Sequence, residues 1–335
     1  MIKAIKKLFV LSFLICLIGT TVLVYQLLSF QHEPIQVTEK NNIFLIKSGT
    51  SITRIAEQLT MQKIIEDPWL FILLAKVKGV ETRVRAGEYQ INSSQSAEDL
   101  LETFTRGSAI QYSLTIIEGW SFKQMLEAIK ADPVLEDTLT EKSNAEIMEL
   151  LGYPDQHPEG LFFPDTYQFP KGTRDIDFLR RAYQVMQKHL EREWNQRDEG
   201  LPLKSSYDAL ILASIIEKET GAGFERPLIS GVFTQRLRKK MRLQTDPTII
   251  YGLGEAFDGD IRFRDLRKDT PYNTYLHAGL TPTPIALPGL DSIRAALHPA
   301  KTEALYFVSK GDGTHQFSAT LEEHNAAVRR YQLKK

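Results

Sequence analysis

The chain has 335 residues, of which 42% are hydrophobic and 25% are charged, a composition typical of a folded protein with about two domains. Its 41 Lys and Arg residues nearly balance 42 Asp and Glu residues, which leaves a formal net charge of -1. Because no excess of positive charge is present to hold a polyanion, this balance argues against a nucleic-acid partner. The single cysteine, Cys16, excludes an intramolecular disulfide and a zinc site built from cysteines.

The N-terminal segment is predicted to anchor the chain in a membrane. No charged side chain occurs between Leu8 and Phe30, and about twenty such residues in a helix span the hydrocarbon core of a bilayer. A cleaved signal peptide is the alternative, but its apolar region is usually only about 7–15 residues long and ends in a small-residue cleavage motif. Because lysines precede the span, we expect residues 1–7 in the cytoplasm, a single pass through the cytoplasmic membrane at residues 8–30, and an exported remainder.

Three stretches that follow a polar linker (residues 31–42) align without gaps, starting at Ile46, Ile91 and Ile116. Each stretch predicts a strand, a turn and a helix. A serine at the equivalent position is expected to cap each helix: Ser51, Ser96 and Ser121. Apolar residues recur at positions i, i+1 and i+4 of each helix, which predicts one face directed toward a core. Gly107 and Pro133 are expected to end the second and third helices, and a further apolar helix is predicted at residues 68–78.

The first of these units resembles a LysM module, a small fold that binds N-acetylglucosamine in bacterial cell walls. The resemblance rests on residues 44–50, Phe-Leu-Ile-Lys-Ser-Gly-Thr, which lead into a helix. It implies a LysM-like domain at residues 43–110, whereas a purely architectural role is the alternative, since any capped amphipathic helix after a strand gives this pattern. Residues 111–335 alternate helical patterns with loops rich in proline and glycine, which predicts a mixed α+β domain and an α+β class for the whole chain.

Two carboxylates stand at the end of a buried helix predicted for residues 206–221. Glu217 lies seven positions after Leu210 and therefore within about 20° of this buried row. Burial and the negative end of the helix dipole raise the pKa of a carboxyl group there, as a general acid requires. Glu219 points about 200° away from Glu217, so the two cannot act on one bond together. Either could instead pair with an arginine, Arg226 or Arg236, and periodicity does not choose between them.

Several motifs in order carry a second resemblance. Leu212-Ala-Ser-Ile-Ile-Glu-Lys-Glu-Thr220 is followed by Leu243-Gln-Thr-Asp-Pro-Thr248 and Tyr272-Asn-Thr-Tyr275. Over nearly the whole chain, this order closely resembles the MltG (YceG-like) family of membrane-anchored endolytic murein transglycosylases. The resemblance makes residues 111–335 the catalytic domain and implies that Glu217, the first Glu of the triplet, is catalytic and that Glu219 supports it. The sequence departs from the family in one loop, where Thr281 and Thr283 replace the expected proline and glycine.

The chemistry implied by the resemblance is cleavage between N-acetylmuramic acid and N-acetylglucosamine within nascent glycan strands. One carboxylate would protonate the leaving oxygen and then accept the proton of the muramyl C6 hydroxyl, which closes on C1 to give a 1,6-anhydro end. We expect polar side chains to bind the substrate and stabilise its cationic centre: Gln244, Thr245, Asp246, Tyr272, Asn273 and Tyr275. The alternative is that the threonine–aspartate segment is only a turn and that the tyrosines are core aromatics.

Three further expectations concern the rest of the chain. Phe162 and Phe163 are expected in the core, with Glu159 and Asp165 as weaker site candidates. No cofactor or metal is expected, because the seven histidines show no ligand spacing and neither a phosphate-binding loop nor a nucleophile elbow occurs. The resemblance also implies contact with bifunctional peptidoglycan synthases and the cell-elongation machinery, in addition to glycan strands.

Two other functions compete with the transglycosylase. A non-catalytic, membrane-tethered scaffold that binds the wall and its synthases would have no use for a carboxyl group at a buried helix end. An ordinary hydrolase would share the acid and differ only in the product end.

Overall fold

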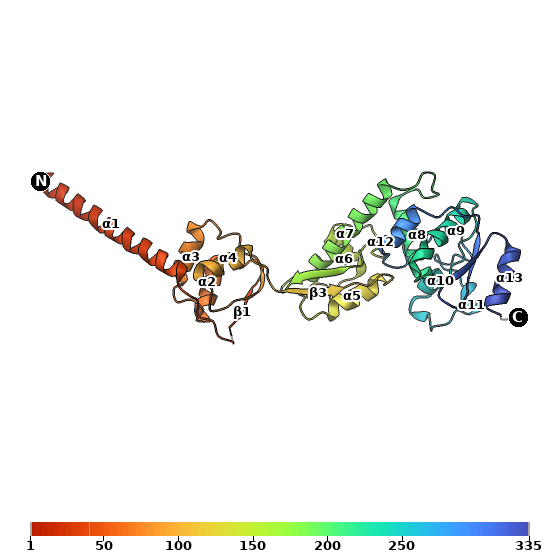
Figure 1. The fold of residues 1–335 in the computed structure, drawn as a ribbon, viewed down its shortest axis with the longest axis horizontal. Helices are drawn as coiled ribbons and strands as arrows, with labels where there is room; N and C mark the ends of the chain where they lie inside the picture. Colours follow the sequence, from red (N-terminus) through yellow and green to blue (C-terminus); the bar gives the residue numbers. More distant parts are fainter. Residues whose placement is uncertain (1, 40, 334–335) are drawn as a thin grey trace. The chain divides into compact units, whose positions relative to one another are not determined.

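The computed structural model describes residues 2–39 and 41–333, and Figure 1 shows their helices and strands. The chain divides into two compact units. The N-terminal unit comprises Met1–Ser113 with Gln168–Thr173, and the C-terminal unit comprises Leu114–Tyr167 with Arg174–Lys335. Helices and strands occur in both, which confirms the α+β class.

The predicted apolar helix forms as α1 (Ile2–His32). Its segment Lys6–His32 has a mean hydropathy of 2.5 and is long and apolar enough to cross a membrane. Apolar side chains such as Leu8 and Phe9 are exposed along it, whereas Phe30, near its end, is buried in the core of the N-terminal unit. The helix therefore fits a single-pass membrane anchor whose last turn packs against the domain that follows.

The N-terminal unit contains the first two of the predicted repeats. Strand β1 (Ile43–Ile46) leads to α2 (Ile52–Met61), and β2 (Gly87–Gln90) leads to α4 (Ala97–Arg106), with α3 (Pro68–Val77) between them. Ser51 and Ser96 cap α2 and α4 through their side chains, as predicted. The two strands pair antiparallel, and Phe44 and Tyr89 of this pair pack on Phe104 of α4. The predicted apolar faces are buried against this sheet.

The third repeat differs in its strand pairing. Its strand β3 (Gln111–Thr115) pairs with β4 (Thr166–Pro170), and both strands run from one unit into the other. Ser121 caps α5 (Phe122–Ala131), which ends before Pro133 as predicted. Sequence similarity between the repeats thus predicted each local element, whereas the strand partner depends on a segment about fifty residues away.

The C-terminal unit is built around α8 (Ser206–Glu219), whose residues from Ala209 to Ile216 are all buried, as predicted. Helices α7 (Asp175–Asn195), α9 (Arg226–Arg238), α10 (Asp246–Leu253) and α12 (Leu290–Leu297) pack against it. This unit also contains α6 (Asn144–Leu151), α11 (Phe263–Leu266), and the 3-10 turns η1 (Gly223–Glu225) and η2 (Gly254–Ala256).

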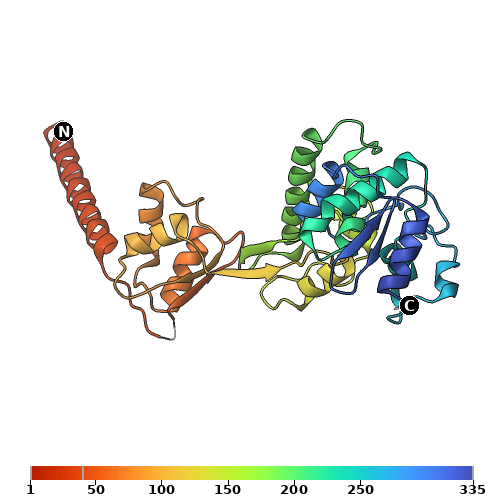
Figure 2. The same cartoon turned by 45° about the vertical axis from the view of Figure 1, so that its right-hand side comes forward.

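The end of the chain completes this unit with a hairpin and a helix. Strands β5 (Tyr306–Ser309) and β6 (His315–Ser318) pair antiparallel, with Val308 opposite Gln316. Helix α13 (Leu321–Tyr331) packs on both strands, and Figure 2 shows the three elements, in blue, side by side. The hairpin and α13 bring residues from beyond position 300 to the end of α8.

Candidate active site

Glu217 is a buried carboxylate whose acceptor positions are taken by three donors. Its Oε1 accepts a hydrogen bond from Arg226 Nη2 at 3.0 Å. Its Oε2 accepts from the Gly289 amide at 3.0 Å and from Ser292 Oγ at 2.7 Å. Gly289 is the N-cap of α12 and Ser292 lies in the first turn of that helix, where backbone amides favour a negative charge. Glu217 thus joins the end of α8 to the start of α12.

Glu219, two residues further along α8, has a different environment. Thr245 donates its hydroxyl to Glu219 Oε1, and no arginine or lysine forms an ion pair with Glu219 among the described residues. Burial raises the pKa of Glu219 to about 7; nearby Asp246 adds to the rise, whereas Thr245, His315 and Arg236 oppose it. A carboxyl group with this pKa exchanges protons near neutral pH, which suits a general acid or base.

A cavity of about 560 Å³ opens beside Glu219. Four of the predicted site residues line it: Glu219, Gln244, Asp246 and Tyr275. Glu217 is not among its lining residues. Residues of the C-terminal hairpin and of α13 form the opposite wall: Tyr306, Phe307, Val308, Ser309, His315, Leu321, His324, Asn325, Val328 and Gln332.

The segment before α10 positions three of the predicted residues. Gln244 adopts a positive φ of 50°, a strained conformation for a residue other than glycine, while its amide donates to Thr274 O at 3.1 Å. Buried Thr245 receives support from Thr274 Oγ1, which accepts its amide hydrogen at 3.1 Å. Asp246 accepts a hydrogen bond from Tyr275 Oη at 2.7 Å. The strained turn directs Thr245 toward Glu219 and leaves Gln244 and Asp246 at the cavity.

Tyr272 and Asn273 have structural contacts. Asn273 is fully buried, donates to the carbonyls of Leu266 and Lys268, and accepts from the Tyr275 amide at 2.9 Å, so its side chain is committed to the loop. Tyr272 hydrogen-bonds Thr283 Oγ1 at 2.9 Å and packs its ring on Tyr251. Neither residue lines the cavity beside Glu219.

Most of the other residues that line this cavity were not predicted as site residues from the sequence. Arg236 was considered only as an ion-pair partner, yet its guanidinium donates to the carbonyls of Leu305 and Leu243, at 2.6 and 2.8 Å, and lies over the Tyr306 ring. His315 lies between aromatic residues of the hairpin, and His324 stacks on Tyr306. No spacing signal in the sequence pointed to His315.

The weaker candidates have structural positions. Phe162 and Phe163 are buried, as expected. Glu159 is also buried and accepts hydrogen bonds from the Phe122 amide at 2.9 Å and from Tyr251 Oη at 3.1 Å, which links the start of α5 to α10. Burial raises the pKa of Glu159 to about 7. Asp165 is exposed and accepts a hydrogen bond from the adjacent Thr166 amide.

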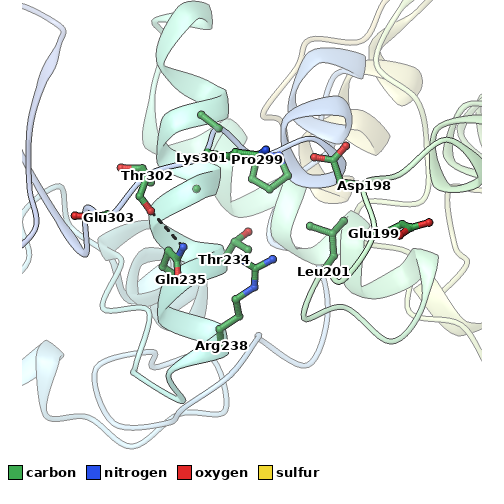
Figure 3. A pocket seen from close by; sticks show the side chains of 12 residues that line it. Asp198, Glu199, Leu201, Thr234, Gln235, Arg238, Pro299, Lys301, Thr302 and Glu303 are labelled. Atoms are coloured by element: carbon green, nitrogen blue, oxygen red, sulfur yellow. Dashed lines mark hydrogen bonds between the residues drawn. The ribbon is translucent and has the colours of Figure 1, made fainter.

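A second cavity of about 470 Å³ lies on another face of α9, and Figure 3 shows Asp198, Leu201 and Arg238 around it. Its acidic residues, Asp198, Glu199 and Glu303, are all exposed. Glu219 is not among the residues that line this second cavity. No cluster of three or more metal-binding side chains occurs within residues 2–39 and 41–333.

The fold and the site define a class: a two-unit α+β protein with an apolar N-terminal helix and a cavity that contains a carboxyl group at the end of a buried helix. Comparison with known proteins is more specific. The YceG-like family model matches residues 44–330, so the chain belongs to the YceG-like family.

Three relatives illustrate the similarity. An endolytic murein transglycosylase of Bacillus subtilis is 32% identical over 317 residues, which cover 89% of this chain and 87% of the relative. The enzyme of the same name from Streptococcus pneumoniae is 28% identical over 96% of this chain and 65% of its own length. The crystal structure of a putative yceG-like protein from Listeria monocytogenes has a TM-score of 0.54 at 30% identity, covering 85% of this chain and 98% of that one.

Proposed function

We propose that this chain is an endolytic murein transglycosylase that cleaves the bond between N-acetylmuramic acid and N-acetylglucosamine and leaves 1,6-anhydro ends. The names of its relatives support the reaction class. The observation that carries the proposal is the cavity in which a carboxyl group with a pKa of about 7 lies among aromatic and polar side chains. Aromatic faces and hydrogen-bonding groups are what sugar rings require of a binding site.

We assign the proton transfer to Glu219 in place of Glu217. The helix turns the two carboxylates about 200° apart, so only the one that faces the substrate can transfer the proton. Glu219 lines the cavity, whereas Glu217 is held by a guanidinium, an amide and a hydroxyl at the start of α12. Glu217 therefore acts as a positioning residue that fixes the end of α8 against α12.

The reaction needs one proton donor and one proton acceptor. Glu219 protonates the glycosidic oxygen as the bond to the muramyl C1 breaks, and the C6 hydroxyl oxygen bonds to C1 as its own proton leaves. The carboxylate of Glu219 is then available to accept that proton. Because the nucleophile is part of the substrate, the closure is unimolecular and consumes no water. Gln244, Asp246 and Tyr275 orient the sugar rings in this proposal, which is supported by their position in the cavity lining.

The test is to treat isolated glycan strands with the purified full chain and identify the products by mass spectrometry. We expect internal cleavage with anhydro ends. Reducing ends would identify a hydrolase, and binding without products would identify a scaffold; either result would overturn the proposal.

A pair of variants tests the assignment within that assay. Glu219→Gln keeps side-chain size but cannot donate the proton, so activity should fall by about 10³-fold or more with the fold retained. Glu217→Gln should keep activity within about tenfold, measured below its unfolding temperature. A folded, inactive Glu217→Gln protein beside an active Glu219→Gln protein would return the catalytic role to Glu217.

We also propose that the anchor holds the enzyme in the cytoplasmic membrane with residues after about Gln31 outside. The support is the apolar helix preceded by lysines in the sequence. A reporter that fluoresces only in the cytoplasm, fused after Lys335, should stay dark, and bright cells would reverse the orientation.

Two further roles are proposed for the regions outside the cavity. The LysM-like domain at residues 43–110 contacts glycan, and the chain acts beside bifunctional peptidoglycan synthases of the elongation machinery, because a strand-cutting enzyme tethered to the membrane meets nascent strands there. Cross-linking in living cells should recover a synthase. If no synthase is recovered, the proposed partnership is wrong, whereas the proposed reaction is unaffected.

A further inference from the structure

A buried histidine–carboxylate pair faces the same cavity as Glu219. Glu225, in the turn between α8 and α9, accepts two hydrogen bonds from His315 of β6: from the backbone amide at 2.9 Å and from Nδ1 at 2.7 Å. The side chains are 12% exposed for His315 and 6% exposed for Glu225. Two contacts to one residue fix both the position of the imidazole and the nitrogen that carries the proton.

The second ring nitrogen of His315 has no partner within the described chain. Only Nδ1 forms a hydrogen bond, and the ring is held edge-on by Phe307 at 5.4 Å between centroids. His315 lines the 560 Å³ cavity together with Glu219. With its hydrogen on Nδ1 directed to Glu225, a neutral imidazole presents an unprotonated Nε2, which is a proton acceptor.

We propose that His315 is the second proton-transfer group of this site and accepts the proton of the muramyl C6 hydroxyl through Nε2. This inference rests on the proposed transglycosylase function. As the C6 oxygen bonds to C1, its proton moves to Nε2; the C1 bond to the glycosidic oxygen breaks, and that oxygen takes the proton of Glu219. The imidazolium then returns a proton to the Glu219 carboxylate, directly or through water, so both groups regain their starting states.

Glu225 is a positioning residue in this scheme. Its carboxylate holds the productive tautomer and stabilises the imidazolium that forms. A positive charge on His315 lowers the pKa of Glu219. The interaction between the two groups therefore favours a protonated His315 beside an ionised Glu219, which is the state that the scheme requires after the first step. Because the acid and the base are different groups, each can begin the reaction in the protonation state that its own step needs.

The scheme predicts a bell-shaped pH dependence. His315 must be neutral, which gives an acidic limb, and Glu219 must be protonated, which gives an alkaline limb near its pKa of about 7. The other titratable or charged groups around His315 come from η1, α9, α10, the following loop, β5 and α13: Glu225, Arg236, Asp246, Tyr275, Tyr306 and His324.

The experiment measures anhydro-product formation by the full chain as a function of pH, for three variants. His315→Gln should lose about 10²-fold in kcat and lose the acidic limb while keeping the alkaline limb. Glu225→Gln still has an oxygen to accept the backbone amide hydrogen but removes the charge, so it should move the acidic limb to lower pH, because the imidazolium loses its counter-charge. His298→Gln is the matched control: His298 Nδ1 lies 2.8 Å from Asp198 and outside this cavity, so its profile should equal the wild type.

The outcomes separate this inference from the proposed function. If the wild type forms anhydro ends and His315→Gln keeps the acidic limb, the role of His315 is overturned and the transglycosylase stands. If the folded Glu225→Gln protein keeps the acidic limb at the wild-type pH, the proposed role of His315 is also overturned. This variant provides the test if His315→Gln does not fold. Absence of anhydro ends from the wild type overturns the proposed function itself.

Discussion

The last turn of α8 carries two carboxylates two residues apart, and they lie in regions with different properties. At the junction with α12, Glu217 meets a guanidinium, a helix N-terminus and a hydroxyl. At the cavity, Glu219 meets one threonine hydroxyl and no paired cation among the described residues. Both carboxylates are shielded from water, so burial alone does not distinguish structure from chemistry. The hydrogen-bond donors around each group distinguish the two. A carboxylate whose oxygens are fully paired stays ionised in a fixed position, whereas a partly paired carboxyl group can gain or lose a proton.

The largest expected effect concerns stability at the junction. Glu217→Gln removes the negative charge from a buried pair and leaves Arg226 without its closest partner, a change that typically costs about 3–5 kcal/mol. The melting temperature should fall by roughly 6–12 °C. Thermal unfolding followed by circular dichroism measures this, with Glu219→Gln as the control, since it removes no paired charge. Equal melting temperatures for the two variants would break the distinction between the two regions.

Glu159 sharpens the comparison because it is buried and accepts only neutral donors. Its pKa is about 7 in the folded chain and about 4.3 when unfolded, so the fold favours the protonated form. The stability that this preference contributes is full below about pH 4.3 and is lost as the pH rises to about 7. Relative to the wild type, Glu159→Gln should therefore gain about 3–4 kcal/mol between pH 4 and pH 8. Urea unfolding of the variant and the wild type at both pH values tests this. An equal difference in unfolding free energy at the two pH values would contradict it.

A smaller loss of stability is expected when one donor is removed from Glu217. Ser292→Ala deletes the hydroxyl that donates to Oε2 at 2.7 Å but leaves Arg226 and the Gly289 amide in place. The loss should be about 1.5 kcal/mol. The pH profile of activity should keep its shape, because Glu219, the proposed proton-transfer group, does not contact Ser292. Denaturant midpoints and product assays measure the two quantities, and a displaced pH profile would tie Glu217 to the chemistry.

The smallest effect is a displacement of one limb of the pH profile. The Thr245 hydroxyl lowers the pKa of Glu219, so Thr245→Val should raise this pKa and move the alkaline limb to higher pH by up to about one unit. The acid would then stay protonated at higher pH. Rates of product formation between pH 6 and pH 9 would show the displacement, and a limb that stays fixed would mean that another group sets it.

Local signals predicted much of the fold. Ser51, Ser96 and Ser121 cap their helices as expected, since a cap depends on the few residues beside it. The burial of α8 followed from its composition. Periodicity also gave the opposite directions of Glu217 and Glu219, but it could not tell which direction opens on a cavity, because that depends on α12 and the β5–β6 hairpin, which lie about 70–100 residues further along the chain.

Only some of the predicted substrate-binding residues lie at the cavity, because their positions too depend on distant parts of the chain. Gln244, Asp246 and Tyr275 reach the cavity, whereas Asn273 uses its amide to close its own loop, a common role for asparagine that the sequence could have indicated. His315 gave no sequence signal because its partner, Glu225, is ninety residues away and neither stands in a recognisable spacing.

The chain passes between the two units in β3 and again in β4, and this affects the order in which the units are completed during synthesis. The N-terminal unit includes Gln168–Thr173, where Lys171 pairs with Glu88 of β2 at 2.8 Å. A ribosome delivers these residues only after about fifty residues of the C-terminal unit have been made. The N-terminal unit therefore cannot be completed as the first product of synthesis, and its last segment arrives already joined to the start of the C-terminal unit. Assembly of the two units is thereby coupled in time, and a chain truncated before β4 would lack part of both.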